Sequence, residues 1–318
     1  MNQTEQPELP LVSIVIPVYN GANYMREAID SALAQSYPNI EILVVNDGSS
    51  DGGATAEIAR SYGPRIRYFE KENGGVSSAL NLGIREMRGS YFSWLSHDDL
   101  YGPEKIAHQV ALLRSFGAKR CVAVCRTDFV NHESKTIRGP ITRLEEDRLL
   151  DWKQALTHLI DRGGLNGCAL LIPREAFDEC GSFDEGLRYI QDYKMWLSLF
   201  LHGYGMLRGK AVDVHSRIHA GQLTQRGREL FRSENLTLGD WIIPELTEIS
   251  RQGPNFLYRY AKYCAKYDLS SLAEKCLRAG KARGVLSLGQ RAGIRFQGLY
   301  GKLRILLRKL YYKLILRR

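Results

Sequence analysis

The sequence predicts an α/β protein with a mostly parallel β-sheet, followed by a helical region. Over the first hundred residues, short apolar runs rich in β-branched residues alternate with segments of helical periodicity, a pattern typical of βαβ units. Polar and acidic residues follow the apolar runs, at the edge where parallel sheets bind their ligands. From about Ser233 the pattern is mostly helical.

The composition is that of a globular protein. Hydrophobic residues make up 44% of the 318 residues and charged residues 25%, which excludes a collagen-like or disordered chain. No apolar run reaches the roughly 18–20 residues of a membrane-spanning helix, and residues 1–10 lack the features of a signal peptide. We therefore expect a cytoplasmic protein whose six cysteines, which include no CxxC pair, are free thiols.

Four strands are predicted in the first half, at residues 11–16, 40–45, 66–69 and 91–95. Helices are predicted between them: from about Tyr24 to a stop at Ser36-Tyr37-Pro38, from the turn at 47–51 to about Ser61, and over 76–87. Polar residues stand at the carboxyl ends of the strands, namely Tyr19, Asn20, Asn46, Asp47, Glu70, His97, Asp98 and Asp99.

The second half is less regular. Strands are predicted at 120–124 and 166–172, separated by a charged, loop-like stretch at 131–148 and a helix at 151–160. A short helix after Pro173 and a helix at 189–201 follow. Residues 258–266 and 270–283 predict a helical hairpin.

The phosphate-binding fingerprints GxxxxGK[ST] and GxGxxG are absent after the first strand. Asp47 could still accept a hydrogen bond from a nucleobase, but Asp-Gly-Ser is also common turn chemistry that would cap the next helix. Asp98 and Asp99 suit a divalent cation that also binds substrate phosphates, or they cap a loop.

Two further groups have a functional and a structural interpretation. Asp192 could be a general base, or a helix N-terminal acid favoured by the helix dipole. His215, Arg217 and His219 alternate along the chain, so they could bind a metal and a phosphate or form the polar face of a strand.

The order of four motifs resembles family 2 glycosyltransferases. These motifs are Ile-Val-Ile-Pro-Val-Tyr-Asn at 14–20, Val-Val-Asn-Asp-Gly-Ser-Ser-Asp at 44–51, Asn-Gly-Gly-Val-Ser-Ser-Ala-Leu-Asn-Leu-Gly-Ile at 73–84, and Ser-His-Asp-Asp-Leu-Tyr-Gly-Pro-Glu-Lys at 96–105. The resemblance covers roughly residues 11–225. It implies the GT-A fold and an inverting transfer from a nucleotide-sugar, expected to be a UDP-sugar, with Mg²⁺ or Mn²⁺.

The resemblance also implies roles for individual residues. Asp192, in Gln191-Asp192, matches the catalytic base, with Trp196 four residues on. Asp98 matches the metal-binding acid of the Asp-x-Asp signature, and Asp99 and His219 complete the implied metal site. Residues implied to line the nucleotide site are Pro17, Tyr19, Asn20, Asp47 (on the uracil ring), Asn73, Ser77, His97 and Arg217.

The sequence departs from the family pattern at three positions. Ser96 replaces the first acid of Asp-x-Asp, Asn46 replaces a common acid, and Gln191 replaces Glu. Activity is expected, because Asp98 and Asp192 remain. The alternative is a catalytically inactive nucleotide- or glycan-binding module that is recruited to membranes.

The net charge of +9 equals the nine basic residues of 290–318, a segment without acids. On a helix, Leu299, Leu303, Leu306, Leu307, Leu310 and Leu314 share one arc, opposite Arg304 and Arg308. This pattern favours a helix that lies on an anionic membrane surface, while packing against the enzyme or a partner subunit is the alternative. A nucleic-acid partner is not expected, because residues 1–289 are formally neutral.

These features predict four parts. Residues 1–110 are the nucleotide-sugar-binding half and 111–232 the acceptor-binding half of one GT-A domain, 233–289 a helical extension, and 290–318 the basic helix. We expect a peripheral enzyme on the inner face of the cell membrane. Its acceptor would be a glycan or a lipid-linked saccharide, as in bacterial cell-envelope polysaccharide biosynthesis.

Overall fold

The computed structural model describes residues 9–140, 144–219, 227–251 and 253–300. The chain divides into two compact units, one formed by Met1–Ala155 with Leu165–Arg226 and the other by Leu156–Gly164 with Gly227–Arg318. Among the described residues, none of the helices combines the length and the apolar character needed to cross a bilayer.

The first unit contains a mixed ten-stranded sheet in the order β3-β2-β1-β4-β9-β6-β10-β5, with β7 beside β6 and β8 beside β10. The strands are β1 (Val12–Val18), β2 (Ile40–Asp47), β3 (Arg67–Lys71), β4 (Tyr91–Trp94), β5 (Leu100–Tyr101), β6 (Cys121–Val130), β7 (Thr136–Arg138), β8 (Arg148–Leu150), β9 (Leu170–Pro173) and β10 (Gly205–Arg217).

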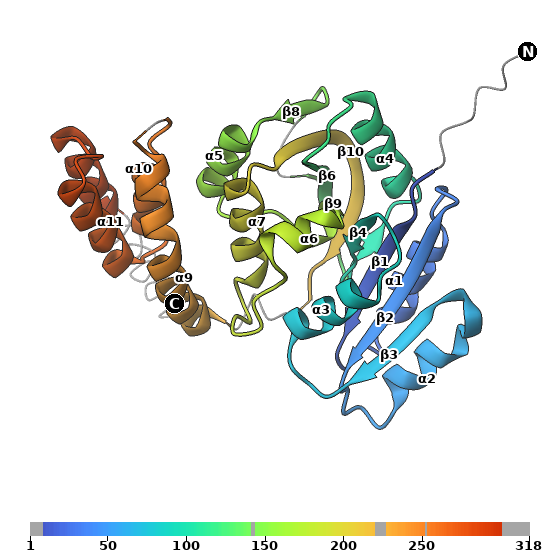
Figure 1. The fold of residues 1–318 in the computed structure, drawn as a ribbon. Coiled ribbons are helices and arrows are strands. Elements are labelled where there is room, and N and C mark those ends of the chain that lie inside the picture. The colour runs from blue at the N-terminus through green and yellow to red at the C-terminus, as the bar shows by residue number, and fades with distance from the viewer. Residues whose placement is uncertain (1–8, 141–143, 220–226, 252, 301–318) are drawn as a thin grey trace, which may run out of the picture. The chain divides into compact units, whose positions relative to one another are not determined.

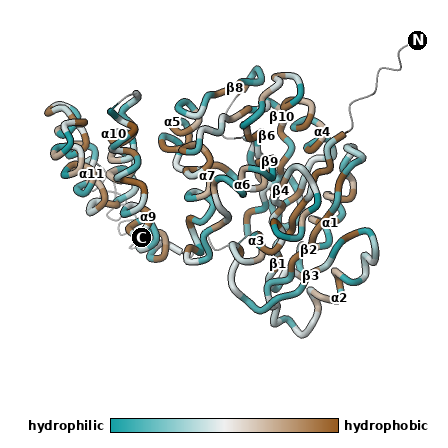
Figure 2. Tube along the Cα trace, viewed as in Figure 1, coloured by the Kyte–Doolittle hydropathy of each residue, from teal (hydrophilic) through white to brown (hydrophobic). Residues whose placement is uncertain are grey.

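Strands β3, β2, β1 and β4 run parallel, β9 is antiparallel to its neighbours β4 and β6, and β6 and β10 pair in parallel. The predicted mostly parallel sheet is therefore confirmed. Every residue of β1 is buried, as expected for a strand with helices on both faces. Figure 1 shows helices on both sides of the sheet, and Figure 2 shows hydrophobic residues concentrated along its central strands.

The helices of the first unit connect and cover these strands. They are α1 (Met25–Leu33), α2 (Ala54–Ser61), α3 (Val76–Glu86), α4 (Lys105–Ser115), α6 (Glu175–Cys180) and α7 (Gln191–Leu201), with short 3-10 turns at Gly63–Arg65 and Gly167–Ala169. Helix α5 (Trp152–Arg162) begins in the first unit, and its residues from Leu156 belong to the second. Helix α3 packs closely on β1, because a Cβ at Gly83 would lie only 2.3 Å from Val15 Cγ1.

The second unit is helical. Its helices are α9 (Arg228–Ile249), α10 (Phe256–Lys266) and α11 (Ser270–Ala282), followed by helical residues 288–300. The predicted hairpin of α10 and α11 is confirmed. Residues 301–318, which hold most of the predicted membrane helix, lie outside the described residues.

Several strands differ from the prediction. The loop-like stretch at 131–148 contains β7 and leads into β8, β6 continues to Val130, and the 13-residue β10 was not predicted beyond its last residues. The expected strand at 166–172 begins with a 3-10 turn, and only Leu170–Pro173 is extended. Polar residues are frequent in β10, so the alternation that marks a half-buried strand is weak there.

Candidate functional site

The polar turn that follows β1 is hydrogen-bonded to the turn that follows β2. Asn20 has φ +49°, and its backbone N–H donates to Ser49 Oγ at 2.9 Å while its Oδ1 accepts from Ser50 N at 2.8 Å. Tyr19 is 46% exposed beside it. Pro17 belongs to the buried strand and pairs in register with Val45. Of the predicted residues on this turn, Tyr19 and Asn20 are therefore open to a ligand.

Asp47 ends β2 in a saturated cluster of donors. Its Oδ1 accepts from Lys71 Nζ at 2.9 Å and Gly74 N at 3.0 Å, and its Oδ2 accepts from Gly75 N at 2.7 Å and Asn73 Nδ2 at 3.2 Å. Ser78 Oγ adds a fifth, weaker contact at 3.4 Å.

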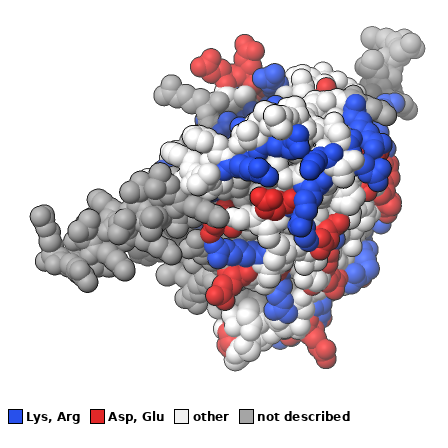
Figure 3. Space-filling view, turned by 90° about the vertical axis from the view of Figure 1, so that its left-hand side faces the viewer, with Lys and Arg blue, Asp and Glu red and all other residues white. Residues whose placement is uncertain are grey.

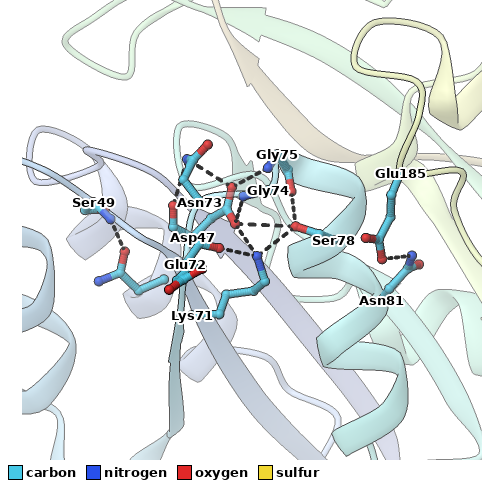
Figure 4. Close-up of polar contacts among 11 residues, drawn as sticks. Asp47, Ser49, Lys71, Glu72, Asn73, Gly74, Gly75, Ser78, Asn81 and Glu185 are labelled. Carbon is cyan, nitrogen blue, oxygen red and sulfur yellow. Dashed lines mark hydrogen bonds and ion pairs between the residues drawn. The ribbon is translucent and has the colours of Figure 1, made fainter.

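The Asp47 side chain is nearly inaccessible, with the residue 3% exposed. A carboxylate offers about four lone-pair sites, so a nucleobase N–H could bond it only by displacing a donor of the protein. In this structure Asp47 anchors the loop at 73–75 to the end of β2 (Figure 4).

Asp98 and His219 meet beyond the end of β4. His219 Nε2 lies 2.9 Å from Asp98 Oδ2, and both side chains keep some exposure, 19% and 16% respectively. The His219 ring also lies against Tyr24, with ring centroids 5.2 Å apart. His97 packs on Gly21, where a Cβ would come within 2.8 Å of its Cδ2, and burial lowers the pKa of His97.

Asp99 turns into the protein instead. It is 6% exposed, and it accepts from the Arg217 backbone N–H at 2.9 Å and from the Cys168 thiol at 3.4 Å. Burial, followed by the neighbouring Asp98 charge, raises the pKa of Asp99 to about 7. Its implied role as a metal ligand would require these bonds to break, so in this structure it supports the Asp98 loop.

Arg217 is fully buried, with 0% exposure. Its guanidinium donates to backbone carbonyls of Asp98, Asn131 and His132 at 2.9–3.1 Å, pairs with Glu27 at 3.0 Å, and lies 4.3 Å from the centre of the Tyr24 ring. It therefore cross-links α1, the loop after β4 and the turn after β6. The resemblance implies that Arg217 contacts the diphosphate, but in this structure its side chain is not accessible to a ligand.

Asp192 lies in the first turn of α7. Its side chain is only partly exposed, and this burial raises the pKa of Asp192 to about 6, although the Tyr193 backbone N–H donates to it at 2.6 Å. A carboxyl group whose pKa lies near neutrality is suited to accept a proton in general-base catalysis.

The segment that leads into α7 is fixed to α3. Buried Asn81 donates to Phe183 O at 2.8 Å and to Glu185 Oε1 at 2.9 Å, and its Oδ1 accepts from Phe183 N at 2.9 Å. Ser77, predicted to contact the nucleotide, is 2% exposed and donates to Leu187 O at 3.2 Å. Helix α3 thus connects the Asp47 cluster with the chain that carries Asp192.

The structure brings together some of the expected residues and not others. Asp98 and His219 are paired, and Asp47 contacts Asn73, whereas no hydrogen bond or ion pair links Asp192 to either group within the described part of the chain. Lys71, Glu27 and Cys168 were missed. Their partners are distant in sequence, so no local motif indicates them.

The Asp98–His219 pair fits a divalent cation that a diphosphate helps to hold. Mg²⁺ and similar ions use one or two carboxylates and complete their shell with phosphate oxygens and water, and imidazole nitrogen is a further common metal ligand. The described residues contain no cluster of three or more His, Cys, Asp or Glu side chains arranged to hold a metal. Asp98 and His219 are the two side chains of this pair that could contact such an ion.

Comparisons with known proteins identify the family of the chain. The family model described as "Glycosyl transferase family 2" matches residues 13–181. An "Uncharacterized glycosyltransferase" of Rickettsia bellii is 42% identical over 304 residues, which cover 91% of this chain and 43% of the relative. One of Rickettsia typhi is 50% identical over 217 residues, covering 68% of this chain and 66% of that protein.

The chain spans between 35% and 66% of the length of the five Rickettsia relatives compared. Among solved structures, that of S. aureus TarS 1–349 in complex with UDP-GlcNAc matches with a TM-score of 0.61 and 15% identity, over 92% of this chain and 89% of TarS 1–349. This likeness shows the shared fold.

Proposed function

The chain belongs to glycosyltransferase family 2, and from this premise we propose that it transfers a sugar from a nucleotide-sugar to a hydroxyl group with inversion at the anomeric carbon. The observation that carries the proposal is the Asp98–His219 pair, 2.9 Å apart at the carboxyl edge of the parallel strands. Such an edge is where open α/β sheets bind their ligands. The related fold of TarS, crystallised with UDP-GlcNAc, supports a UDP-sugar as donor.

The residues divide into donor and acceptor roles. Tyr19 and Asn20 would contact the nucleoside at the open turn after β1. The loop at 73–75, anchored by Asp47, would form the wall beside it. Residues 1–110 would bind the donor and 111–232 the acceptor.

Asp192 would accept the proton of the attacking hydroxyl. As that oxygen bonds to the anomeric carbon, the bond from this carbon to the diphosphate oxygen breaks, and the proton moves to the Asp192 carboxylate. Asp98 and His219 would hold Mg²⁺ or Mn²⁺, which when bound offsets the charge that develops on the leaving diphosphate.

The acceptor is proposed to be a glycan or lipid-linked saccharide, and the site of action a membrane surface, as the basic sequence at 290–318 predicts. A peripheral location would bring the enzyme to a lipid-linked acceptor. Assembly of cell-envelope polysaccharide is the process that these features suit.

A thermal-shift screen of nucleoside diphosphates with and without Mn²⁺ tests the donor site. A ligand that binds only the native state raises its stability. We expect UDP to stabilise the protein in a metal-dependent way, and Asp98→Ala to abolish that dependence. Glu104→Ala, which removes an exposed carboxylate on the neighbouring segment, is the matched control and should respond like the wild type.

Two results would count against the proposal. If no nucleotide stabilises the protein, the transferase mechanism fails. If UDP binds but a nucleotide-sugar is neither hydrolysed nor transferred in the presence of metal, the chain is a binding module.

A further inference from the structure

Residues 288–300 form a helix that exposes its largest apolar side chains. Leu288, Phe296 and Leu299 are 77%, 72% and 69% exposed, and Ala292 is exposed between them. At ~100° per residue these four positions fall within an arc of about 80°. We refer to Leu288, Ala292, Phe296 and Leu299 as the apolar stripe.

The helix is held in place, so the apolar stripe is not the surface of a loose end. It begins with a capping box in which Ser287 N donates to Gln290 Oε1 at 2.9 Å and Gln290 N donates to Ser287 Oγ at 3.2 Å. On the side away from the stripe, Ile294 is 1% exposed. Gly293 also faces α10, where a Cβ would lie 3.2 Å from the Tyr258 hydroxyl.

The region around this helix is strongly basic. Residues 253–300 contain nine Lys and Arg and two Asp and Glu, a net charge of +7. Six of these cations are exposed and form no ion pair with another described residue: Lys262, Lys266, Arg278, Lys281, Arg283 and Arg295. Figure 3 shows Lys and Arg interspersed with Asp and Glu on one face of the molecule.

An exposed apolar stripe of this kind marks an interaction surface, and the charge around it selects the partner. A second copy of the chain would bring two surfaces of the same sign together, which charge repulsion opposes. An anionic lipid bilayer accepts apolar side chains among its acyl chains and attracts Lys and Arg at its surface.

We propose that the apolar stripe inserts into an anionic lipid surface, with the exposed cations of 253–300 contacting the headgroups. The inference rests on the membrane location included in the proposed function. It assigns the contact with the lipid surface to residues within 253–300, which precede most of the predicted basic helix. It does not depend on the transfer chemistry.

Vesicle co-sedimentation of the full chain tests the assignment. The probe is vesicles of phosphatidylglycerol and phosphatidylcholine in equal parts, compared with phosphatidylcholine alone. We expect binding to the anionic vesicles only, weakened by salt. Because burial of one large apolar side chain changes an equilibrium by roughly tenfold or more, Phe296→Ser with Leu299→Ser should reduce binding by about 100-fold or more.

The matched control is Phe116→Ser with Ile137→Ser, which removes two apolar side chains from the first unit that are 42% and 54% exposed. It should bind vesicles like the wild type. Equal binding by the stripe variant and the wild type would overturn the proposal, as would wild-type binding to neither vesicle. Concentration-dependent self-association that the stripe variant abolishes would instead assign the stripe to a second copy. UDP binding, measured on the same preparations, separates any of these failures from failure of the transferase proposal.

Discussion

Replacing Asp47 with asparagine tests whether this carboxylate is primarily an anchor of the protein's own loop. The side chain is 4% exposed and accepts from Lys71, Asn73, Gly74 and Gly75. Asparagine has nearly the same shape, so it changes charge and hydrogen bonding with little change in packing. We expect a clear loss of stability in the first unit, measured by urea and thermal unfolding.

The size of the loss follows from the contacts. Asparagine keeps one acceptor oxygen but places an NH₂ group where the other oxygen was. Depending on the orientation of the amide, this NH₂ group lies opposite two donors of the protein, either Lys71 Nζ and Gly74 N or Gly75 N and Asn73 Nδ2. Two hydrogen bonds are lost in either orientation. Two hydrogen bonds to a charged group contribute about 1.5–3 kcal/mol each, or about 3–6 kcal/mol together. For a unit of this size that lowers Tm by roughly 6–24 °C.

The control is Glu70→Gln on the adjacent strand, which weakens an ion pair with Arg60 whose side chains are 49% and 65% exposed. Exposed pairs contribute about 0–1 kcal/mol, so this variant should unfold almost like the wild type. If Asp47→Asn were as stable as Glu70→Gln but lost UDP affinity, the anchor interpretation would be refuted and Asp47 would be a direct nucleotide contact.

Further predictions concern the base, the buried cation and the closest helix contact. Asp192→Asn should lower kcat by about 10²–10⁴-fold and leave UDP affinity, measured by calorimetry, unchanged; a parallel loss of affinity would make Asp192 structural. Because the pKa of Asp192 is raised from 3.8 to about 6, wild-type activity should fall as pH drops through about 6. The same shift lowers the free energy of unfolding as pH rises from 3.8 to about 6, because the folded state holds this proton more tightly than the unfolded state. Asp192→Asn should therefore become more stable than the wild type at pH 7 in unfolding titrations; an equal pH dependence of the two stabilities would argue against the buried carboxyl. Arg217→Leu should destabilise by about 3–5 kcal/mol, whereas Arg138→Leu on exposed β7 should change the free energy of unfolding by at most about 0.5 kcal/mol; similar values for both would contradict the role of Arg217 as a cross-link. Gly83→Ala should destabilise by about 1–3 kcal/mol, since its Cβ would meet Val15 at 2.3 Å; a gain in stability, as helix propensity alone predicts, would show that β1 and α3 can separate.

The sequence by itself determined the local elements and their order. The alternation of apolar runs and helical periods places β1 to β4 and α1 to α3, because both patterns repeat within a few residues along the chain. The hairpin of α10 and α11 follows from the same periodicity. The position of Asp98 at the end of β4 and of Asp192 at the start of α7 could likewise be predicted, since each is adjacent to its element.

Only the tertiary structure decided what those side chains contact. Lys71 reaches Asp47 across 24 positions, and Arg217 reaches Glu27 across 190. In this structure Asp47 and Arg217, both expected to contact the substrate, are buried and hold segments of the protein itself.

The basic charge shows the same limit. The formal charges of residues 1–289 sum to zero, which suggested that the basic excess lies only in 290–318. The compact units divide the chain at other positions, and residues 253–300 of the second unit alone carry a net charge of +7. A sequence pattern records which residues are near one another along the chain. Burial, charge pairing and the outward face of the 288–300 helix depend on which distant segments fold against each residue, and that is determined only when the packed structure forms.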